Sequence, residues 1–220
     1  DGEQIFHGRR ASSVAFSPDE RLLASGAEDG GVIVWNLEEG KAEFRLSGHH
    51  SRITDLAWSP DGEMLASSSV DGTVYLWNAA VGMGQHALSG HSGMAVNEIA
   101  WGTDGNTLYT AGEDQTIGVW AAILGKRQRT LTGHVQAVRT LAYDDRHQRL
   151  VSGSALGVLR VWNGDGTSAT LRGHTDPVRT VIFYPDGDRI LSGSNAGDLY
   201  VTDPTGDLSC TDLPRLHGEH

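Results

Sequence analysis

The sequence predicts an all-β protein built from consecutive four-stranded antiparallel sheets. Short runs of β-branched and aromatic residues recur along the chain, and strong turn signals separate them. The whole pattern also repeats, because Trp35, Trp77, Trp120 and Trp162 are spaced 42, 43 and 42 residues apart, and Thr202 follows 40 residues later. No segment shows the 3.6-residue periodicity of an amphipathic helix, so we expect strands throughout.

The segment 48–78 shows the repeat unit most completely. It opens with Gly-His, and three strand-sized runs follow at Ile53–Trp58, Met64–Ser69 and Thr73–Asn78. Ser-Pro-Asp-Gly separates the first two runs, which is a type I turn signal because Pro presets φ at the second position. Asp-Gly separates the second run from the third. This order predicts an antiparallel meander.

The repeat resembles that of the WD-repeat β-propeller family, whose signature is Gly-His near the start and Trp-Asp near the end. Here the closing pair is Trp-Asn at positions 35, 77 and 162, and the resemblance covers nearly all 220 residues. It implies radially arranged four-stranded blades. The five expected blades of the single segment 1–220 are approximately 7–48, 49–90, 91–133, 134–173 and 174–216.

Five blades are too few for the seven-bladed ring that is usual in this family. We expect an open segment or fragment of a larger, about seven-bladed propeller, and a closed five-bladed ring is the alternative. The fourth strand of each blade is expected to be shorter, more polar and at an edge. In the fifth copy this strand is expected at Leu208–Asp212.

The resemblance also implies a buried hydrogen-bond chain in each blade. The Trp N–H donates to a hydroxyl, the hydroxyl donates to one imidazole nitrogen, and the other imidazole N–H donates to an Asp. The expected structural anchors are His7, Ser25, Asp29 and Trp35; His49, Ser67, Asp71 and Trp77; His91, Thr110, Asp114 and Trp120; His134, Ser152 and Trp162; His174 and Ser192.

The last two copies depart from this pattern. Leu156 and Ala196 stand where the Asp is expected, and Thr202 replaces the Trp of the fifth copy. We therefore expect the fourth and fifth blades to be less rigid than the second and third. A catalytic Ser-His-Asp interpretation of the anchors is disfavoured, because an enzyme does not need five copies of its nucleophile and the sequence indicates no oxyanion hole.

Aromatic residues end the first strand of every copy: Phe16, Trp58, Trp101, Tyr143 and Phe183. We expect them to form the core between blades, since each blade buries both faces against its neighbours. A ligand-stacking surface is the alternative interpretation.

Composition excludes several classes of protein. The net charge of −11 disfavours nucleic acid and anionic membranes as partners. One cysteine, Cys210, excludes an internal disulfide framework and favours a reducing, cytoplasmic compartment. No apolar run has the length of a membrane span. The 220-residue sequence contains no signal peptide. Because it begins at Asp1 rather than Met, whether a targeting signal precedes it stays open.

No catalytic, metal or cofactor site is expected. Five of the ten histidines are the anchors, and the others are scattered without a His-x-x-x-His or Cys-His cluster. The Asp-Gly pairs are turn signals, and no phosphate loop or dinucleotide fingerprint occurs. The sequence therefore predicts neither an enzyme nor a cofactor-binding protein.

The expected functional surface is the rim formed by the loops before each first strand and by the turns between the second and third strands. In the family this face commonly binds proteins or peptides, and loops on a rigid scaffold carry function. The partner-binding candidates are Arg9, Arg10, Glu28, Arg52, Val70, Met94, Asn97, Glu113, Arg139, Arg179 and Asn195. The arginines favour an acidic peptide or phosphopeptide; ordinary solvated loop charge is the alternative.

The sequence thus predicts a non-catalytic protein-interaction scaffold or sensor module within a larger signalling or regulatory protein. Further blades or domains of that protein, or a second copy of the chain, are expected at the open ends. The alternative is a small-ligand-binding or enzymatic propeller that uses its central channel. Asp55, Glu98, Thr140 and Thr180 occupy the channel-facing position in that case.

Overall fold

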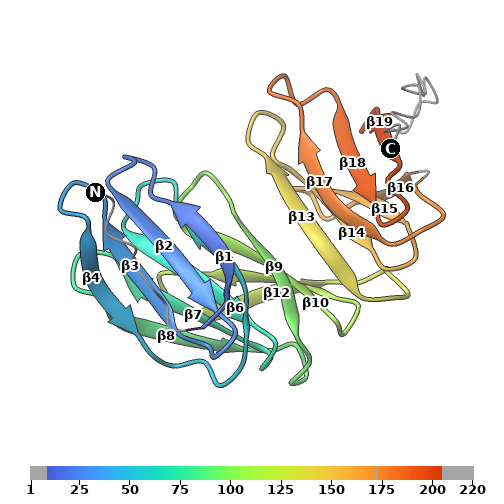
Figure 1. The fold of residues 1–220 in the computed structure, drawn as a ribbon. Helices are drawn as coiled ribbons and strands as arrows, with labels where there is room; N and C mark the ends of the chain where they lie inside the picture. Colours follow the sequence, from blue (N-terminus) through green and yellow to red (C-terminus); the bar gives the residue numbers. More distant parts are fainter. Residues whose placement is uncertain (1–8, 172, 205–220) are drawn as a thin grey trace, which may run out of the picture. The chain divides into compact units, whose positions relative to one another are not determined.

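The computed structural model describes residues 9–171 and 173–204, which contain nineteen β-strands and no helix. The strands form five antiparallel sheets, and each sheet is a meander of strands that follow one another in the chain (Figure 1). The all-β prediction is confirmed. The chain divides into two compact units, residues 1–131 and 132–220, which are considered separately below.

Unit 1 holds three four-stranded sheets, which we name blades 1, 2 and 3. Blade 1 contains β1 (Ala11–Phe16), β2 (Leu22–Ala27), β3 (Val32–Asn36) and β4 (Lys41–Leu46). Blade 2 contains β5 (Ile53–Trp58), β6 (Met64–Ser69), β7 (Thr73–Asn78) and β8 (Met83–Ser89). Blade 3 contains β9 (Val96–Trp101), β10 (Thr107–Gly112), β11 (Ile117–Ala121) and β12 (Lys126–Leu131).

Unit 2 holds blades 4 and 5. Blade 4 contains β13 (Val138–Asp144), β14 (Arg149–Ser154), β15 (Leu159–Asn163) and β16 (Ser168–Leu171). Blade 5 contains β17 (Val178–Phe183), β18 (Ile190–Ser194) and β19 (Leu199–Thr202). The fourth strand expected at Leu208–Asp212 lies outside the described residues.

The turn signals act as the sequence predicts. In blade 2, Asp61 Oδ1 accepts hydrogen bonds from Ser59 Oγ at 2.5 Å and from Glu63 N at 3.0 Å. Gly62 has φ of +75°, a left-handed conformation that favours glycine. This turn joins β5 to β6, so the two strands pair antiparallel with Trp58 opposite Leu65.

The outer strands correct one expectation. β4 and β12 have six residues and β8 has seven, so the fourth strand is not shorter in unit 1. In blade 2 the reason is that pairing continues up to the turn, where Asn78 is opposite Met83. Only β16, with four residues, is a short fourth strand among those described. These strands are nevertheless largely exposed, as the polar sequence predicts.

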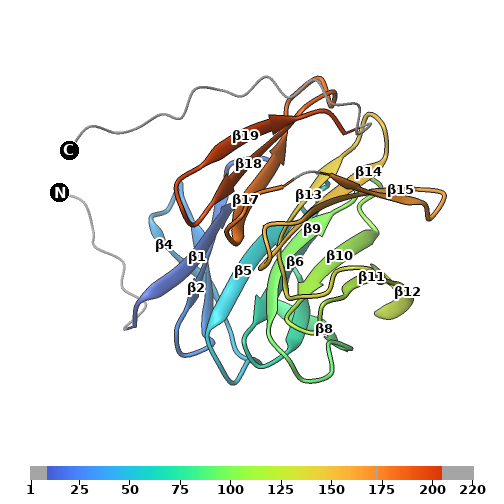
Figure 2. The same cartoon turned by 90° about the vertical axis from the view of Figure 1, so that its right-hand side faces the viewer.

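The first strands hold the blades of unit 1 together. β1, β5 and β9 lie side by side (Figure 2). Trp58 Nε1 donates to Ala15 O of blade 1 at 3.0 Å, and Trp101 Nε1 donates to Ala57 O of blade 2 at 3.0 Å. Both rings are buried, at 7% and 8% exposure. The prediction that these aromatic residues form the core between blades is confirmed for Trp58 and Trp101.

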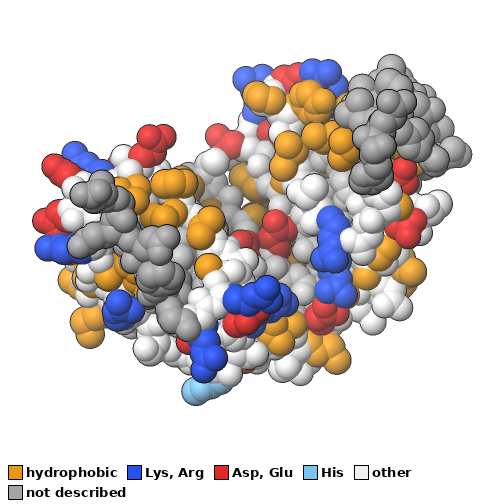
Figure 3. Space-filling model, viewed as in Figure 1, with side chains coloured by type: hydrophobic (Ala, Val, Ile, Leu, Met, Phe, Trp, Pro, Cys, Tyr) orange, Lys and Arg blue, Asp and Glu red, His pale blue; other side chains and the backbone are white. Residues whose placement is uncertain are grey.

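Phe16, at the same position in blade 1, is the exception. Its side chain is 63% exposed, and Val14 on the same face of β1 is 61% exposed. Hydrophobic side chains accordingly gather over β1 and β2 in Figure 3. The prediction that Phe16 is core is wrong in this structure, because no blade of unit 1 packs against that face of β1.

A register shift in the first strand adds a second link between blades. In β1 it lies between Ala11 and Ser13, so the intervening Ser12 is directed away from the β1–β2 pairing. The hydroxyl of Ser12 donates to Ile53 O of blade 2 at 2.6 Å. Thr54, at the same place in β5, donates to Val96 O of blade 3 at 2.5 Å. The bulge thus aims a hydroxyl at the backbone of the next blade.

Candidate functional site

The candidate site is the loop rim, defined as the loops before each first strand together with the turns between the second and third strands. One backbone hydrogen bond closes this rim in each blade. The first residue of the turn between the second and third strands donates its N–H to the backbone carbonyl of the residue directly before the first strand. The pairs are Glu28 with Arg10 (3.0 Å), Val70 with Arg52 (3.0 Å), Glu113 with Ala95 (2.9 Å), Ala155 with Ala137 (2.9 Å) and Asn195 with Pro177 (3.0 Å).

Blade 3 contains the complete anchor that the resemblance implies. Trp120 Nε1 donates to Thr110 Oγ1 at 2.9 Å, and Thr110 Oγ1 lies 2.6 Å from His91 Nε2. His91 Nδ1 lies 2.9 Å from Asp114 Oδ1. His91 and Thr110 are fully buried. The anchor ties the loop before β9 to the turn between β10 and β11.

In blade 2 a threonine enters the chain. Trp77 Nε1 donates to Ser67 Oγ at 2.9 Å. Ser67 Oγ in turn lies 2.8 Å from His49 Nε2. His49 Nδ1 is 2.9 Å from Thr73 Oγ1 and 3.4 Å from Asp71 Oδ2. Since the Thr73 hydroxyl donates to Asp71 at 2.5 Å, it accepts from His49 and relays the bond to the carboxylate.

This threonine and its counterpart in blade 3 were not predicted from the sequence. Thr116 in blade 3 donates both its N–H and its hydroxyl to Asp114 Oδ1, at 3.1 and 2.9 Å. A threonine two residues after the anchor Asp is the signal that would have found both. The extra hydrogen bonds hold the carboxylate in place on the turn.

Blade 1 retains the inner part of the anchor. Trp35 Nε1 donates to Ser25 Oγ at 2.6 Å, and both residues are buried. Asp29 Oδ1 accepts from Gly31 N at 3.1 Å, which stabilises its own turn. His7, the expected imidazole, lies outside the described residues.

Blade 4 has an incomplete anchor, as its sequence predicts. Trp162 Nε1 donates to Ser152 Oγ at 2.8 Å. Ser152 Oγ in turn lies 2.7 Å from His134 Nε2. The buried His134 Nδ1 has no hydrogen-bond partner among the described residues. Leu156, at the position of Asp114, is 52% exposed. Arg160 replaces the aromatic ring that faces the imidazole in blades 2 and 5, and its guanidinium lies 5.3 Å from the Trp162 ring.

Blade 5 departs further. His174 Nε2 lies 2.9 Å from Ser192 Oγ, and no residue in the described part of the chain forms a hydrogen bond with its buried Nδ1. Thr202 stands where the other blades have Trp, so no indole N–H reaches the serine. The imidazole instead stacks on the ring of Tyr200 at 4.5 Å.

The imidazoles of the anchors favour their neutral form. Burial lowers the pKa of His49 and of His91, even though the carboxylates of Asp71 and Asp114 raise it. In blade 4, burial and then the nearby positive charge of Arg160 lower the pKa of His134 to about 4. A neutral imidazole has one N–H, so each anchor has a defined direction of hydrogen bonding.

The carboxylates favour their charged form. Burial raises the pKa of Asp114, but the hydrogen bond from His91 and those from Thr116 outweigh burial, so the pKa lies below its ordinary value. The pKa of Asp71 is lowered for the same reason, with Thr73 and the backbone N–H of His50 as the donors.

The partner-binding candidates of unit 1 lie on the rim, and most are exposed. Arg9, Arg10 and Arg52 are exposed, and no described residue forms a hydrogen bond or ion pair with their side chains. The other candidates in this unit include both acidic and apolar side chains, so the rim is chemically mixed. Glu28, Val70 and Met94 are exposed, whereas Asn97 and Glu113 are half-buried.

In unit 2 the rim candidates differ in environment. Arg179 is exposed, and its Nε donates to Asn195 Oδ1 across the rim. Arg139 is half-buried. Arg139 and Arg179 occupy the register-shift position of the first strand, whereas Arg10 and Arg52 precede it, so the arginines do not form one equivalent row.

Asp55, the acidic candidate for a channel site, binds backbone and hydroxyl donors in three blades. Its Oδ2 accepts from Ile99 N of blade 3 at 3.0 Å, and its Oδ1 accepts from Leu56 N at 2.8 Å. Ser13 Oγ of blade 1 lies 3.5 Å from Oδ1. Burial raises the pKa of Asp55 to about 6. Both oxygens are therefore used within the protein.

Neither a metal-binding cluster nor a membrane-spanning helix occurs among the described residues. In residues 9–171 and 173–204, no three His, Cys, Asp or Glu side chains cluster so that they could hold a metal ion. Over the same ranges, no helix has the length and apolar character needed to cross a membrane.

Comparison with known families identifies the repeats. The model of the WD domain, G-beta repeat, matches residues 4–36, 40–78, 83–121, 125–163 and 166–203. The five matches together include most of the chain. Each match ends on a third strand of the structure or just after it.

Individual relatives match over shorter stretches. The human WD repeat-containing protein 38 is 45% identical over 42 residues, which is 19% of this chain and 13% of that protein. The small ribosomal subunit protein RACK1z of Oryza sativa subsp. japonica is 48% identical over 40 residues, or 18% of this chain and 12% of that protein. The chain thus spans a small fraction of the curated relatives that it matches.

A solved structure shows the fold over a longer range. The structure of U3-55K superposes with a TM-score of 0.84 at 23% sequence identity, covering 91% of this chain and 63% of that one. At this identity the likeness shows the fold alone. The five sheets correspond to WD-repeat blades of a partial propeller.

Proposed function

Because the chain belongs to the WD-repeat family, we propose that it is a non-catalytic module that binds partner proteins through its loop rim. WD-repeat domains commonly bind proteins and are generally not enzymes. The module would act as a scaffold or sensor within a larger signalling or regulatory protein, in the cytoplasm. A reducing compartment is consistent with the single cysteine.

One observation carries this proposal: the repeats agree where they are buried and differ where they are exposed. Ser67, Thr110 and Ser152 occupy the same anchor position, and all are fully buried. The first residue of the rim turn instead differs from blade to blade, and none of these residues is buried: Glu28, Val70, Glu113, Ala155 and Asn195. Anchors of this kind give rigid support to loops whose side chains vary, which is the arrangement of a recognition surface.

The chemistry of the rim in unit 1 favours a partner segment with acidic residues. Arg9, Arg10 and Arg52 present guanidinium groups without described partners, and a guanidinium binds a carboxylate or phosphate through two parallel hydrogen bonds. Glu28, whose N–H binds Arg10 O, places a negative charge on the same rim. We therefore infer a partner with discrete acidic positions that match the arginines, rather than a uniformly acidic one.

Charge reversal on the rim tests the proposal. A variant with Arg9→Glu, Arg10→Glu and Arg52→Glu is compared with the full chain and with a matched control, Lys41→Glu, Arg45→Glu and Arg129→Glu. The control has the same change in charge on exposed positions of the outer strands. Proteins crosslinked to each variant in cells are quantified by mass spectrometry.

We expect a defined set of proteins to be lost with the rim variant and retained with the control. Circular dichroism of both variants establishes that they fold. If the two variants capture the same proteins in the same amounts, the rim does not bind the partners, and the proposal is wrong.

A further inference from the structure

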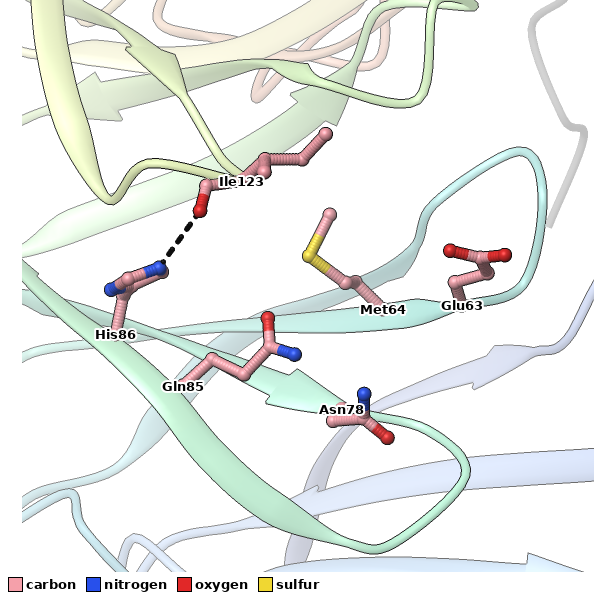
Figure 4. A pocket seen from close by; sticks show the side chains of 6 residues that line it. All are labelled: Glu63, Met64, Asn78, Gln85, His86 and Ile123. Atoms are coloured by element: carbon pink, nitrogen blue, oxygen red, sulfur yellow. Dashed lines mark hydrogen bonds between the residues drawn. The ribbon is translucent and has the colours of Figure 1, made fainter.

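A cavity of about 510 Å³ lies between blades 2 and 3, near the turns that join first to second and third to fourth strands. In an antiparallel meander these turns lie at the opposite ends of the strands from the loop rim. The cavity is therefore separate from the loop rim. Figure 4 shows the six side chains that line it. They are Glu63, Met64, Asn78, Gln85, His86 and Ile123.

The cavity has a defined wall at the junction of the two blades. Nε2 of His86, on β8, lies 3.1 Å from the backbone oxygen of Ile123, in the turn between β11 and β12. A carbonyl oxygen only accepts, so His86 Nε2 carries the proton and donates. The Met64 side chain points toward Ile123 in Figure 4. This wall therefore combines a fixed polar contact with an apolar surface.

The amide of Asn78 supplies a hydrogen-bond donor. Its Oδ1 accepts from Ala80 N at 3.0 Å and from Val81 N at 3.2 Å, so its Nδ2 is directed away from the turn. In blade 1 the corresponding Nδ2, of Asn36, donates to Glu43 Oε2 at 3.4 Å. In blade 2, Gln85 takes the position of that glutamate, and no described residue accepts from Asn78 Nδ2.

Exposed apolar side chains and one negative charge lie at or next to the cavity. Ile123 lines it, and Leu124 follows in the same turn of blade 3. In blade 2, Val81 lies in the turn after Asn78 and Met83 starts β8, and each of these four apolar side chains is exposed by more than half of its surface. The corresponding turn of blade 4 is Gly-Asp-Gly-Thr, so the apolar turns are not a general property of the repeat. Glu63 is exposed at the cavity, and no described side chain pairs with its carboxylate.

We propose that this cavity binds a segment of a partner protein in which an apolar side chain stands next to a lysine or arginine. The apolar side chain packs against Met64 and Ile123, which removes exposed apolar surface from water. The cation pairs with Glu63 at the edge of the cavity, and Asn78 Nδ2 donates to a carbonyl of the bound segment. Charge complementarity thus selects a basic partner here, whereas the arginines of the loop rim select an acidic one.

The test uses peptides displayed on phage. A random 12-residue library is selected against the full chain, and enriched sequences are synthesised with a fluorescein label for anisotropy titrations. We expect the enriched peptides to place an apolar residue next to Lys or Arg. Glu63→Lys should weaken their binding at least tenfold, and Ile123→Asp should do the same.

Matched controls lie on blade 1. Glu38→Lys and Leu37→Asp make the same changes at exposed positions of the turn between β3 and β4, and we expect binding within twofold of the full chain. All four positions are exposed, so the variants are expected to fold, which circular dichroism checks. Hydrogen exchange should show protection by the peptide at residues 78–86 and 121–125.

Four results would overturn the proposal. The first is that no peptide is enriched, and the second is that Glu63→Lys binds the enriched peptides as tightly as the full chain does. The third is concentration-dependent self-association in sedimentation experiments that Ile123→Asp abolishes, which would assign the surface to a second copy. Loss of peptide binding in the Arg9, Arg10 and Arg52 variant would place the peptides on the loop rim, which counts against the cavity and leaves the proposed function standing.

Discussion

His91 Nδ1 donates to Asp114 Oδ1 over 2.9 Å, and this contact sets the direction of the hydrogen bonds in the blade 3 anchor. A carboxylate only accepts, so the proton of the neutral imidazole lies on Nδ1. His91 Nε2 must then accept from the Thr110 hydroxyl, which in turn accepts from Trp120 Nε1. The orientation of three buried groups thus depends on one aspartate on the turn.

Removal of this carboxylate should destabilise blade 3. Asp114→Ala leaves the buried Nδ1–H of His91 without an acceptor, and we expect a loss of about 1–3 kcal/mol in stability. The free energy of opening, measured by amide hydrogen exchange in β9–β12, is the appropriate readout. Glu38→Ala, which removes an exposed carboxylate without a described partner, serves as the control and should leave these values unchanged. An unaltered blade 3 in Asp114→Ala would show that the anchor does not stabilise it.

The opposite change should stabilise blade 4. Leu156→Asp places a carboxylate where His134 Nδ1 now has no partner, and we expect a gain of about 1 kcal/mol. Little apolar burial is lost, because Leu156 is largely exposed. The carboxylate should also raise the pKa of His134 above its value of about 4, which NMR titration of the imidazole measures. Leu156→Ala, which supplies no acceptor, should show neither effect.

Blades 4 and 5 should open more readily than blades 2 and 3. Within residues 9–171 and 173–204, the buried Nδ1 atoms of His134 and His174 have no partners, whereas His49 and His91 are hydrogen-bonded at both nitrogens. Native-state hydrogen exchange should therefore give lower protection in β14 and β18 than in β6 and β10. Equal protection in all four second strands would contradict the link between complete anchors and rigidity.

Asp55 should make stability increase as the pH falls. Burial raises its pKa to about 6 from an ordinary 3.8, so the folded protein binds this proton more tightly than the unfolded chain does. At pH values between 3.8 and about 6, unfolding releases this proton from Asp55. The contribution of Asp55 to the free energy of unfolding therefore grows as the pH falls through 6. It is complete below about pH 4 and is lost as the pH rises through 6, with a span of at most about 3 kcal/mol.

The comparison with Asp55→Asn isolates this effect. The histidine anchors, whose pKa values are lowered by burial, act in the opposite direction, because the unfolded chain takes up their protons below pH 6.5. They contribute equally to both proteins and cancel in the difference. Urea unfolding from pH 7 to pH 4 should show the full chain gaining stability relative to the variant. A constant difference across this range would mean that Asp55 titrates normally in the fold.

Much of the fold could be predicted from the sequence because each strand and turn is specified locally. The Ser-Pro-Asp-Gly turn forms between β5 and β6 as its residues dictate, and the third strands of blades 1 to 4 end one residue after their tryptophans. The missing acceptor of His134 was also predictable, since Leu156 cannot accept a hydrogen bond. The relay through Thr73 was missed because a hydroxyl within reach of an imidazole depends on side-chain placement across the turn.

The sequence by itself determined the repeat, the all-β class, the anchor residues and the blades in which an anchor is incomplete. The repeat and the all-β class follow from residue type and spacing along the chain, and the role of the anchor residues follows from the resemblance to the WD-repeat family. Only the tertiary structure decided that Phe16 is exposed while Trp58 is buried, and that Asp55 joins three blades. It also decided that a cavity lined by both polar and apolar side chains, with the carboxylate of Glu63 among them, forms between blades 2 and 3. The physical reason is that burial, pKa and cavity shape depend on which blade packs against which face, and a repeated local pattern does not contain that information.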